Sequence, residues 1–224
     1  MPLRPRQLAL ALDHAESYAR DDFLSGPSNA AALTLVESWP DWPANAVALI
    51  GPEGSGKSHL AAIWAGASGA RTMSGRALGD SDLLASLATS ALVVEEAAVA
   101  DQRALFHLLN LVREEDSYLL LTARTAPTLW PVAIADLASR LRALPIITLQ
   151  APDDAMLRGV IIKLASDRQL AFDDSVVGYL LSHIERSFAA ARAAVVALDN
   201  EALRQRRPVT RALAADLFRD RDQE

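Results

Sequence analysis

The sequence predicts an α/β protein in which helices cover a parallel five-stranded sheet and an all-helical domain follows. Two observations support this fold class. Short apolar runs alternate with segments of helix length up to residue 149, as parallel βαβ units require. After Pro152 the strand pattern is absent, and only helical patterns follow. The 224 residues, about half of them apolar, suffice for one large or two small domains with a proper core.

Five apolar runs are the expected strands, at residues 46–50, 71–73, 91–94, 118–122 and 145–149, of which 71–73 is the weakest. Four helices are expected after them, at 153–169, 174–186, 188–206 and 211–219. The N-caps of these helices are expected at Asp153, Asp173, Ser187 and Thr210. We therefore divide the chain into a flexible arm (1–14), an α/β domain (15–150) and a helical domain (151–224).

Composition excludes several classes of protein. The chain has no cysteine, which rules out disulfides, thiolate metal sites and cysteine nucleophiles. The net charge of −6 and a pI near 5.3 oppose strong autonomous binding to nucleic acid, which usually needs a basic face. No stretch approaches 18 consecutive apolar residues, and no secretory leader is recognisable. We expect a cytoplasmic protein with no membrane association.

Residues 51–58 read GPEGSGKS, which matches the P-loop pattern GxxxxGK[ST] between an expected strand and an expected helix. The three glycines allow the backbone to curl so that successive N–H groups face a phosphate, and the helix start adds partial positive charge. Lys57 is expected to reach the β- and γ-phosphates, and Ser58 to give its hydroxyl oxygen to Mg²⁺. The predicted nucleotide-binding residues of this segment are Gly51, Gly54, Ser55, Gly56, Lys57, Ser58 and His59.

The expected strand at 91–94 leads directly into two carboxylates. Glu95 is a candidate magnesium ligand, although it is one methylene longer than the aspartate of most P-loop proteins, so efficient turnover is not expected. Glu96 is the candidate base that polarises water. Both also fit a solvated strand end. Thr122 closes the next expected strand and is a candidate sensor of the γ-phosphate, a position that equally suits a structural threonine.

Two arginines stand out by location. Arg140 lies on the expected helix before the last strand, where oligomerising P-loop ATPases carry an arginine that reaches a neighbour's nucleotide and stabilises transition-state charge. Arg142 faces a different direction and is the weaker choice. Arg192 interrupts an otherwise apolar helix, where it needs an anionic partner such as a phosphate. A surface position for Arg140 and a salt bridge for Arg192 are the alternatives.

These elements resemble the DnaA branch of the AAA+ superfamily over nearly all of residues 18–220. Residues 21–33 are similar to the family's adenine-side box, in which Phe23, Leu24 and Asn29 match. GPEGSGKSHLA matches Walker A, VVEEA Walker B, YLLLTA the sensor 1 strand, LASRL the arginine-finger box and SFAAARAAVVALD the sensor 2 helix. The resemblance implies an AAA+ P-loop module with a three-layer α/β domain and a helical lid.

The departures from the family are also informative. DnaA initiators carry an N-terminal interaction domain and a basic C-terminal DNA-reading domain, and we expect neither in this chain. Residues 6–12, RQLALAL, resemble the QLxLxL sliding-clamp motif of the Hda family, the regulatory inactivators of DnaA. The resemblance assigns Gln7 to a polar subsite of the clamp, and it assigns three residues to the hydrophobic cleft: Leu8, Leu10 and Leu12. An edge strand or a helix start is the alternative for this segment.

The resemblance implies a negative regulator of chromosomal replication initiation. The sliding clamp (the DNA polymerase III β subunit) recruits such a protein, so that DNA is contacted only through the clamp. Nucleotide, ADP or ATP with Mg²⁺, orders the lid, and Arg140 promotes hydrolysis of ATP bound to the DnaA initiator.

A helicase loader or other replication factor, a small-molecule P-loop kinase and a nucleotide-stabilised scaffold are the alternative functions. Association of the chain with itself stays open.

Overall fold

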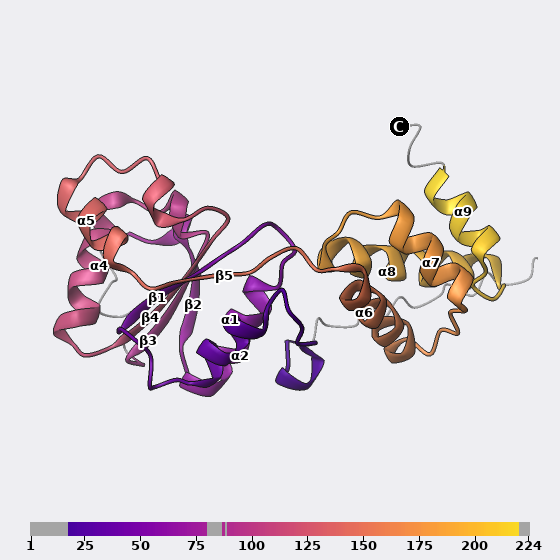
Figure 1. Ribbon diagram of the computed structural model, residues 1–224, viewed down its shortest axis with the longest axis horizontal. Coiled ribbons are helices and arrows are strands. Elements are labelled where there is room, and N and C mark those ends of the chain that lie inside the picture. The colour runs from indigo at the N-terminus through magenta and orange to yellow at the C-terminus, as the bar shows by residue number, and fades with distance from the viewer. Residues whose placement is uncertain (1–17, 80–86, 88, 220–224) are drawn as a thin grey trace, which may run out of the picture.

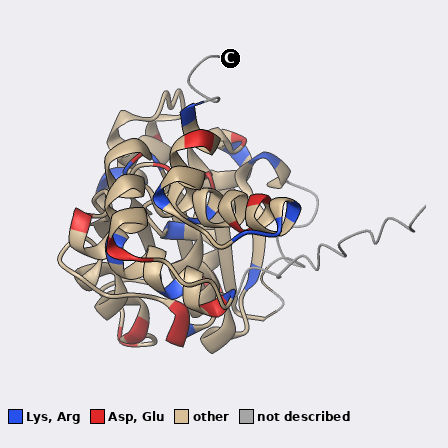
Figure 2. Ribbon diagram, turned by 90° about the vertical axis from the view of Figure 1, so that its right-hand side faces the viewer, with Lys and Arg blue, Asp and Glu red and all other residues tan. Residues whose placement is uncertain are grey.

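The structure, a computed structural model, describes residues 18–79, 87 and 89–219. The described chain has two parts, an α/β part around one sheet and a part made of helices α6 to α9, which lie at opposite ends of the view in Figure 1. In that described part, no helix combines the length and the apolar character needed to cross a bilayer. Seen from the helical end, Lys and Arg (blue) and Asp and Glu (red) are interspersed over the ribbon (Figure 2).

The sheet has five parallel strands in the order β2-β3-β4-β1-β5. Their bounds are β1 Ala46–Ile50, β2 Arg71–Ser74, β3 Ala91–Glu95, β4 Tyr118–Ala123 and β5 Ile146–Thr148. The predicted parallel sheet is thus confirmed, with β5 shorter than the expected run. Because β1 and β4 lie in the centre, the carboxyl ends of β1, β3 and β4 meet at one edge, where α/β proteins place their ligands.

Helices cover both faces of the sheet. One face carries α1 (Ala30–Glu37) and α2 (Lys57–Ser68), and the other carries α4 (Gln102–Glu114) and α5 (Ala135–Ala143). Alternate residues of β1 enter different cores: Val47 and Leu49 pack with α1 and α2, whereas Ala48 and Ile50 pack with α4 and α5. Burial on both faces explains why this strand is an uninterrupted apolar run.

An aromatic cluster fixes α2 against the sheet. Trp64 on α2 stacks on Trp42, with ring centroids 4.8 Å apart, and Tyr118 on β4 meets Trp42 edge-on. The Trp42 indole nitrogen donates a hydrogen bond of 2.7 Å to the Leu35 carbonyl of α1. These contacts hold α1 and α2 together, so that the first residues of α2 have a defined position at the sheet edge.

The helical part consists of α6 (Asp154–Asp167), α7 (Asp174–His183), α8 (Phe188–Gln205) and α9 (Arg211–Arg219). All four expected N-caps accept a hydrogen bond from a backbone N–H three residues on, at distances of 2.8, 2.9, 3.0 and 3.3 Å for Asp153, Asp173, Ser187 and Thr210. The helices therefore begin where the sequence predicts. Three of them end one to three residues earlier than expected.

Short 3₁₀ helices occupy the connections: η1 (Arg20–Asp22), η2 (Gly75–Ala77), η4 (Ala97–Val99) and η5 (Pro127–Leu129). η2 and η4 follow neighbouring strands and lie against each other. A Cβ added to Gly75 would lie 2.5 Å from the Glu96 carbonyl oxygen, so the backbones approach more closely than any side chain allows. The turn after β3, which carries the candidate carboxylate Glu96 directly after Glu95 at the strand end, is thereby supported from the side.

Candidate functional site

The loop from Gly51 to Gly56 joins the end of β1 to the start of α2, in the strand–loop–helix arrangement that the sequence predicts. Gly54 and Gly56 have φ of +68° and +97°, which L-residues with a Cβ rarely adopt. Gly51 is required for space, because a Cβ there would lie 2.6 Å from the Leu149 carbonyl oxygen. All three predicted glycines therefore have a physical reason, and the loop is curled as a phosphate cradle requires.

Lys57 begins α2 and turns back into this loop. Its ammonium donates to the carbonyl oxygens of Gly51 at 2.8 Å and Pro52 at 2.7 Å. Burial, followed by the nearby Arg124 guanidinium, lowers the pKa of Lys57, while Glu53 and Glu95 act in the opposite direction. The cation thus lies at the loop with neutral carbonyls as its hydrogen-bond partners. A phosphate oxygen at the loop would provide the negative charge that these carbonyls lack.

Two further groups mark the loop. Arg124, just after β4, forms an exposed ion pair of 2.6 Å with Glu53 of the loop. Ser55 is fully buried, and its hydroxyl oxygen has no hydrogen-bond partner within the described part of the chain. An unpaired buried hydroxyl costs free energy, so it is usually kept for a reason. It lies beneath the cradle, 2.9 Å from the position that a Cβ on Gly51 would take.

The carboxylates and Thr122 meet at the same edge of the sheet. Glu95 is the half-buried last residue of β3, and its charge reaches the Lys57 ammonium. Glu96 is exposed and has a left-handed backbone, with φ of 53°. Its N–H donates to the Thr122 hydroxyl oxygen at 3.3 Å. Thr122 is therefore buried and tied to the turn that presents the carboxylates, a structural role that does not prevent a sensing one.

The side chains beside the loop include oxygen donors of the kind that bind Mg²⁺. The exposed Ser58 hydroxyl and the Glu95 carboxylate are hard oxygen ligands beside the phosphate loop. Among the described residues, no group of three or more His, Cys, Asp or Glu side chains could hold a metal alone. One hydroxyl and one carboxylate suit Mg²⁺, which completes its shell with phosphate oxygens and water, and they do not suit an all-protein metal cage. The residues fit the ion.

The segment with Phe23, Leu24 and Asn29, the predicted adenine-side box, lies beside the phosphate loop. The side-chain oxygen Oδ1 of Asn29 accepts a hydrogen bond from the Gly26 N–H at 2.9 Å, and its side-chain nitrogen Nδ2 donates to the Leu24 carbonyl at 3.0 Å. Asn29, which is buried, therefore shapes the turn that carries Leu24. The Phe23 ring is buried and lies 3.6 Å from the position of a Cβ on Gly56, so it borders the cradle directly.

His59 links this box to α2. Its Nε2 lies 3.0 Å from the Ala19 carbonyl oxygen, and its ring meets Phe23 and Tyr18 edge-on, with centroids 5.1 and 5.3 Å apart. Burial chiefly lowers the pKa of His59, the Ala19 carbonyl opposes that shift, and Arg192 adds to it. A neutral, half-buried imidazole at this position forms part of an aromatic wall beside the loop.

The first turn of α8 rests on the phosphate loop. The Phe188 N–H donates to the Gly54 carbonyl at 2.9 Å, and the Phe188 ring lies 3.5 Å from the position of a Cβ on Gly56. Ser187 is equally close, since a Cβ on Gly54 would lie 2.6 Å from its own Cβ. Sequence reasoning missed Phe188, although a large ring directly after an N-cap serine, followed by three alanines, was a visible signal.

Arg192 lies one turn further along α8 than these residues. Its guanidinium carbon is 5.9 Å from the centroid of the Tyr18 ring, and its charge reaches His59. The helical part therefore places Arg192 at the aromatic wall, whereas Phe188 and Ala189 are the α8 side chains closest to the glycines of the cradle. Contact of Arg192 with a phosphate stays a prediction.

Arg140 lies elsewhere. It is half-buried on α5, and its guanidinium carbon is 5.3 Å from the centroid of the Phe106 ring on α4. α5 covers the face of the sheet opposite to α2, so Arg140 lies across the sheet from the helix that follows the chain's own phosphate loop. The arm residues Gln7, Leu8, Leu10 and Leu12 lie outside the described residues, and their role stays a prediction.

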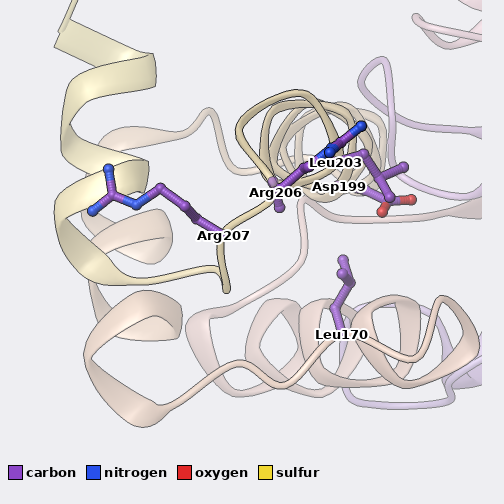
Figure 3. A pocket seen from close by; sticks show the side chains of 6 residues that line it. Leu170, Asp199, Leu203, Arg206 and Arg207 are labelled. Atoms are coloured by element: carbon purple, nitrogen blue, oxygen red, sulfur yellow. The ribbon is translucent and has the colours of Figure 1, made fainter. Parts of the chain in front are cut away.

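A separate cavity of about 310 Å³ opens in the helical part (Figure 3). It is lined by Leu170, Asp199, Ala202, Leu203, Arg206 and Arg207. Three of these residues lie on the C-terminal part of α8, the two arginines follow that helix, and Leu170 follows α6. The phosphate loop contacts the opposite end of α8, so this cavity is not part of the site.

Solved structures share this arrangement. Domain III of the Thermotoga maritima replication initiation protein DnaA matches with a TM-score of 0.74 and 18% identity, over 91% of this chain and 96% of that one. AMPPCP-bound DnaA from Aquifex aeolicus matches with a TM-score of 0.67 and 18% identity, over 80% and 64%. The Thermotoga maritima RuvB Holliday junction branch migration motor matches with a TM-score of 0.74 and 19% identity, over 91% and 72%.

Neither a protein-family model nor a curated protein matches the sequence. At identities below 20%, the structural likeness establishes the fold. The five-stranded parallel sheet and the helical C-terminal part are those of domain III of DnaA and of RuvB, so the chain has a DnaA-like AAA+ fold.

Proposed function

We propose that this chain binds an adenine nucleotide, ADP or ATP, with Mg²⁺ at the loop 51–58. The observation that carries the proposal is the convergence of three elements on that loop. The glycine cradle holds the Lys57 ammonium, the ends of β3 and β4 bring Glu95 and Thr122 to the same edge, and α8 closes on Gly54. A cation, hard oxygen ligands and a lid are the parts that binding a nucleotide phosphate requires.

The base is the second part of the proposed ligand. Phe23, His59 and Phe188 supply flat or apolar surfaces beside the cradle, which suit a purine ring. Two of the structural neighbours are DnaA proteins bound to AMPPCP, an adenine nucleotide analogue. That ligand supports adenine as the base in this chain.

We further propose that the protein is a regulatory inactivator of the Hda type, which acts in the cytoplasm on the replication initiator DnaA. Residues 7–12 match the clamp-binding pattern, which supports recruitment by the sliding clamp and only indirect contact with DNA. Arg140 is the candidate finger in trans. It lies on α5, on the face of the sheet opposite to α2, and it has no carboxylate partner among the described residues.

The proposal assigns different roles to the chain's own nucleotide site and to Arg140. Glu95 is longer than the aspartate of most P-loop proteins, so slow turnover in this chain's own site is expected. A guanidinium inserted into a neighbouring ATP site stabilises negative charge that develops in the transition state and raises the rate by roughly 10³ or more. On this proposal the chain needs its own nucleotide for order, and it contributes Arg140 to a reaction in the initiator.

The test measures hydrolysis of ATP bound to DnaA in the presence of the sliding clamp loaded on DNA. We expect the chain to stimulate hydrolysis, and Arg140→Ala to lower the stimulated rate roughly 10³-fold while nucleotide and clamp binding persist. Arg142→Ala, two residues away and exposed on the same helix, is the matched control and should keep the rate. Equal stimulation by the Arg140 and Arg142 variants would refute the assignment of the finger.

Recruitment is tested separately. Gln7→Ala combined with Leu10→Ala should abolish binding to the purified clamp, because it removes the polar contact and the central apolar anchor of the arm. A pull-down with the replicative helicase serves as the comparison. Clamp binding retained by this variant would remove the tethering role of the arm. Binding of the unmodified chain to the helicase in place of the clamp would favour the helicase-loader alternative.

A further inference from the structure

The side chain of Arg140 is restrained by an aromatic ring. Its guanidinium carbon lies 5.3 Å from the centroid of Phe106, within the distance at which a cation is attracted by the face of a ring. Both side chains are half-buried, and Phe106 also packs against the core beneath α4 and α5. The ring is therefore fixed on one side by the protein and offers its face to the guanidinium.

The two helices that carry this pair are held in register by a further contact. The Gln102 side chain at the start of α4 donates to the Pro131 carbonyl at 2.9 Å and accepts from the Ala133 N–H at 2.8 Å. These residues lie just before α5, so the segment that leads into α5 is tied to the first turn of α4. The position of Phe106 relative to Arg140 is thus set by backbone and side-chain contacts together.

The ring contact leaves the charge of Arg140 available. Among the described residues, Arg140 forms no ion pair, so no carboxylate neutralises its guanidinium. Arg142 on the same helix is more exposed and, within that part of the chain, contacts neither a ring nor a carboxylate. Of the two arginines, only Arg140 combines a restrained side chain with an unneutralised charge. This combination suits a cation that has to meet a developing anion in a fixed orientation.

We propose that Phe106 is a positioning residue for Arg140. This inference rests on the proposed finger in trans and names a second residue of that device. The long side chain of arginine has many rotamers, and a face contact reduces them to those in which the guanidinium plane lies over the ring. Phe106 does not touch the nucleotide on this account. It acts by holding Arg140 in the arrangement that enters the neighbouring ATP site.

The experiment uses the full chain in the stimulated hydrolysis of DnaA-bound ATP, with the clamp on DNA. Phe106→Leu keeps an apolar side chain and removes the aromatic face, whereas Phe106→Tyr keeps the face. We expect Phe106→Leu to lower the maximal stimulated rate about 10- to 100-fold, because a misplaced group loses rate on that scale. The concentration for half-maximal stimulation should stay unchanged, and Phe106→Tyr should stay within about threefold of the unmodified protein.

Leu111→Ala is the matched control for packing, since Leu111 is also a half-buried apolar residue of α4 against the same core. It should lower the melting temperature without lowering the stimulated rate. A double-mutant cycle gives a further readout. If Phe106 acts through Arg140, then Phe106→Leu has no additional effect on the rate once Arg140 is Ala.

The outcomes separate the two proposals. A normal rate for Phe106→Leu, together with a lost rate for Arg140→Ala, would overturn the positioning role and leave the finger intact. Independent, additive losses from Phe106→Leu and Arg140→Ala would overturn it as well. A normal rate for Arg140→Ala would remove the finger itself. If Phe106→Leu does not fold, the comparison of Phe106→Tyr with Phe106→Met carries the same test, because methionine retains apolar bulk without a ring.

Discussion

His59 connects the start of α2 to the segment before η1, and protonation of its ring lowers the stability of the folded state. Burial lowers the pKa of His59 in the folded state, while the unfolded chain titrates near the ordinary value of about 6.5. Below that value the unfolded state binds more protons than the folded state, so stability falls as the pH drops through 6.5 toward the folded pKa. Above the unfolded pKa the contribution to stability is fully present.

We therefore expect the melting temperature to fall between pH 7.5 and pH 5.5, and part of that fall to disappear in His59→Gln. The exposed His107 on α4 is the matched control, and His107→Gln should retain the full dependence. Identical pH profiles for the two variants would contradict the burial of His59.

Some glycines are required by the fold, whereas others occupy positions where a side chain would fit. Gly66 lies in the exposed interior of α2, with no atom within 4 Å of a Cβ placed there. Gly66→Ala should stabilise the protein by about 0.5–1 kcal/mol, because alanine loses less entropy in a helix. Gly51→Ala should destabilise it by about 1–3 kcal/mol, because the added methyl meets the backbone of Leu149.

Thermal unfolding measures both effects. For a chain of this size, 1 kcal/mol corresponds to a shift of roughly 2–4 °C in melting temperature. A Gly51→Ala variant as stable as Gly66→Ala would show that the loop does not approach the backbone of Leu149 as closely as described above.

At the scale of elements, the first turn of α8 is the contact between the lid and the phosphate loop. Phe188→Ala should weaken the affinity for ADP about tenfold, because the ring that covers Gly56 is lost and the lid no longer rests firmly on the cradle. Phe172→Ala removes a half-buried ring from the same helical core at a site away from the loop. It should lower stability and leave the affinity unchanged. Equal affinities for the two variants would contradict a coupling of lid and loop.

The beginnings of the helices were predictable from the sequence because an N-cap is a local signal. Ser187, for example, caps α8 through its own side chain, three residues from the N–H that it binds. The ends were less predictable, since no glycine marks them. α7 ends at His183 because Ile184 is already extended, and α8 ends where Arg206 takes a left-handed conformation with φ of 52°.

In the candidate site, too, local features were predictable from the sequence and long-range contacts were not. The glycines and Lys57 are contiguous in sequence, so a pattern of eight residues predicts their arrangement. Phe188 reaches Gly54 from 134 positions away in the chain, and the Phe106–Arg140 contact joins two helices. Such contacts depend on how elements pack, which periodicity and spacing do not encode. The placement of Arg192 beside Tyr18 belongs to the same class.

At the scale of the whole molecule, contacts between residues far apart in sequence join the α/β part to the helical part. The Ser28 hydroxyl donates to the Met156 sulfur of α6 at 3.4 Å, and the Phe188 N–H donates to the Gly54 carbonyl. Lys163 on α6 forms an ion pair with Asp22 of η1. Each contact involves either the phosphate loop or the segment of the adenine-side box. The position of the helical part is therefore tied to the residues that border the candidate site.

The central claim is that an adenine nucleotide binds at this junction, with its phosphates at Lys57. Titration calorimetry of the full chain with ADP and with ATP, in the presence of Mg²⁺, tests it most directly. We predict measurable binding by the unmodified protein and a loss of about 10- to 100-fold in affinity for Lys57→Ala, as expected when a charge-assisted hydrogen bond to phosphate is removed. Absence of binding to the unmodified protein, or undiminished binding to a folded Lys57→Ala variant, would contradict the account.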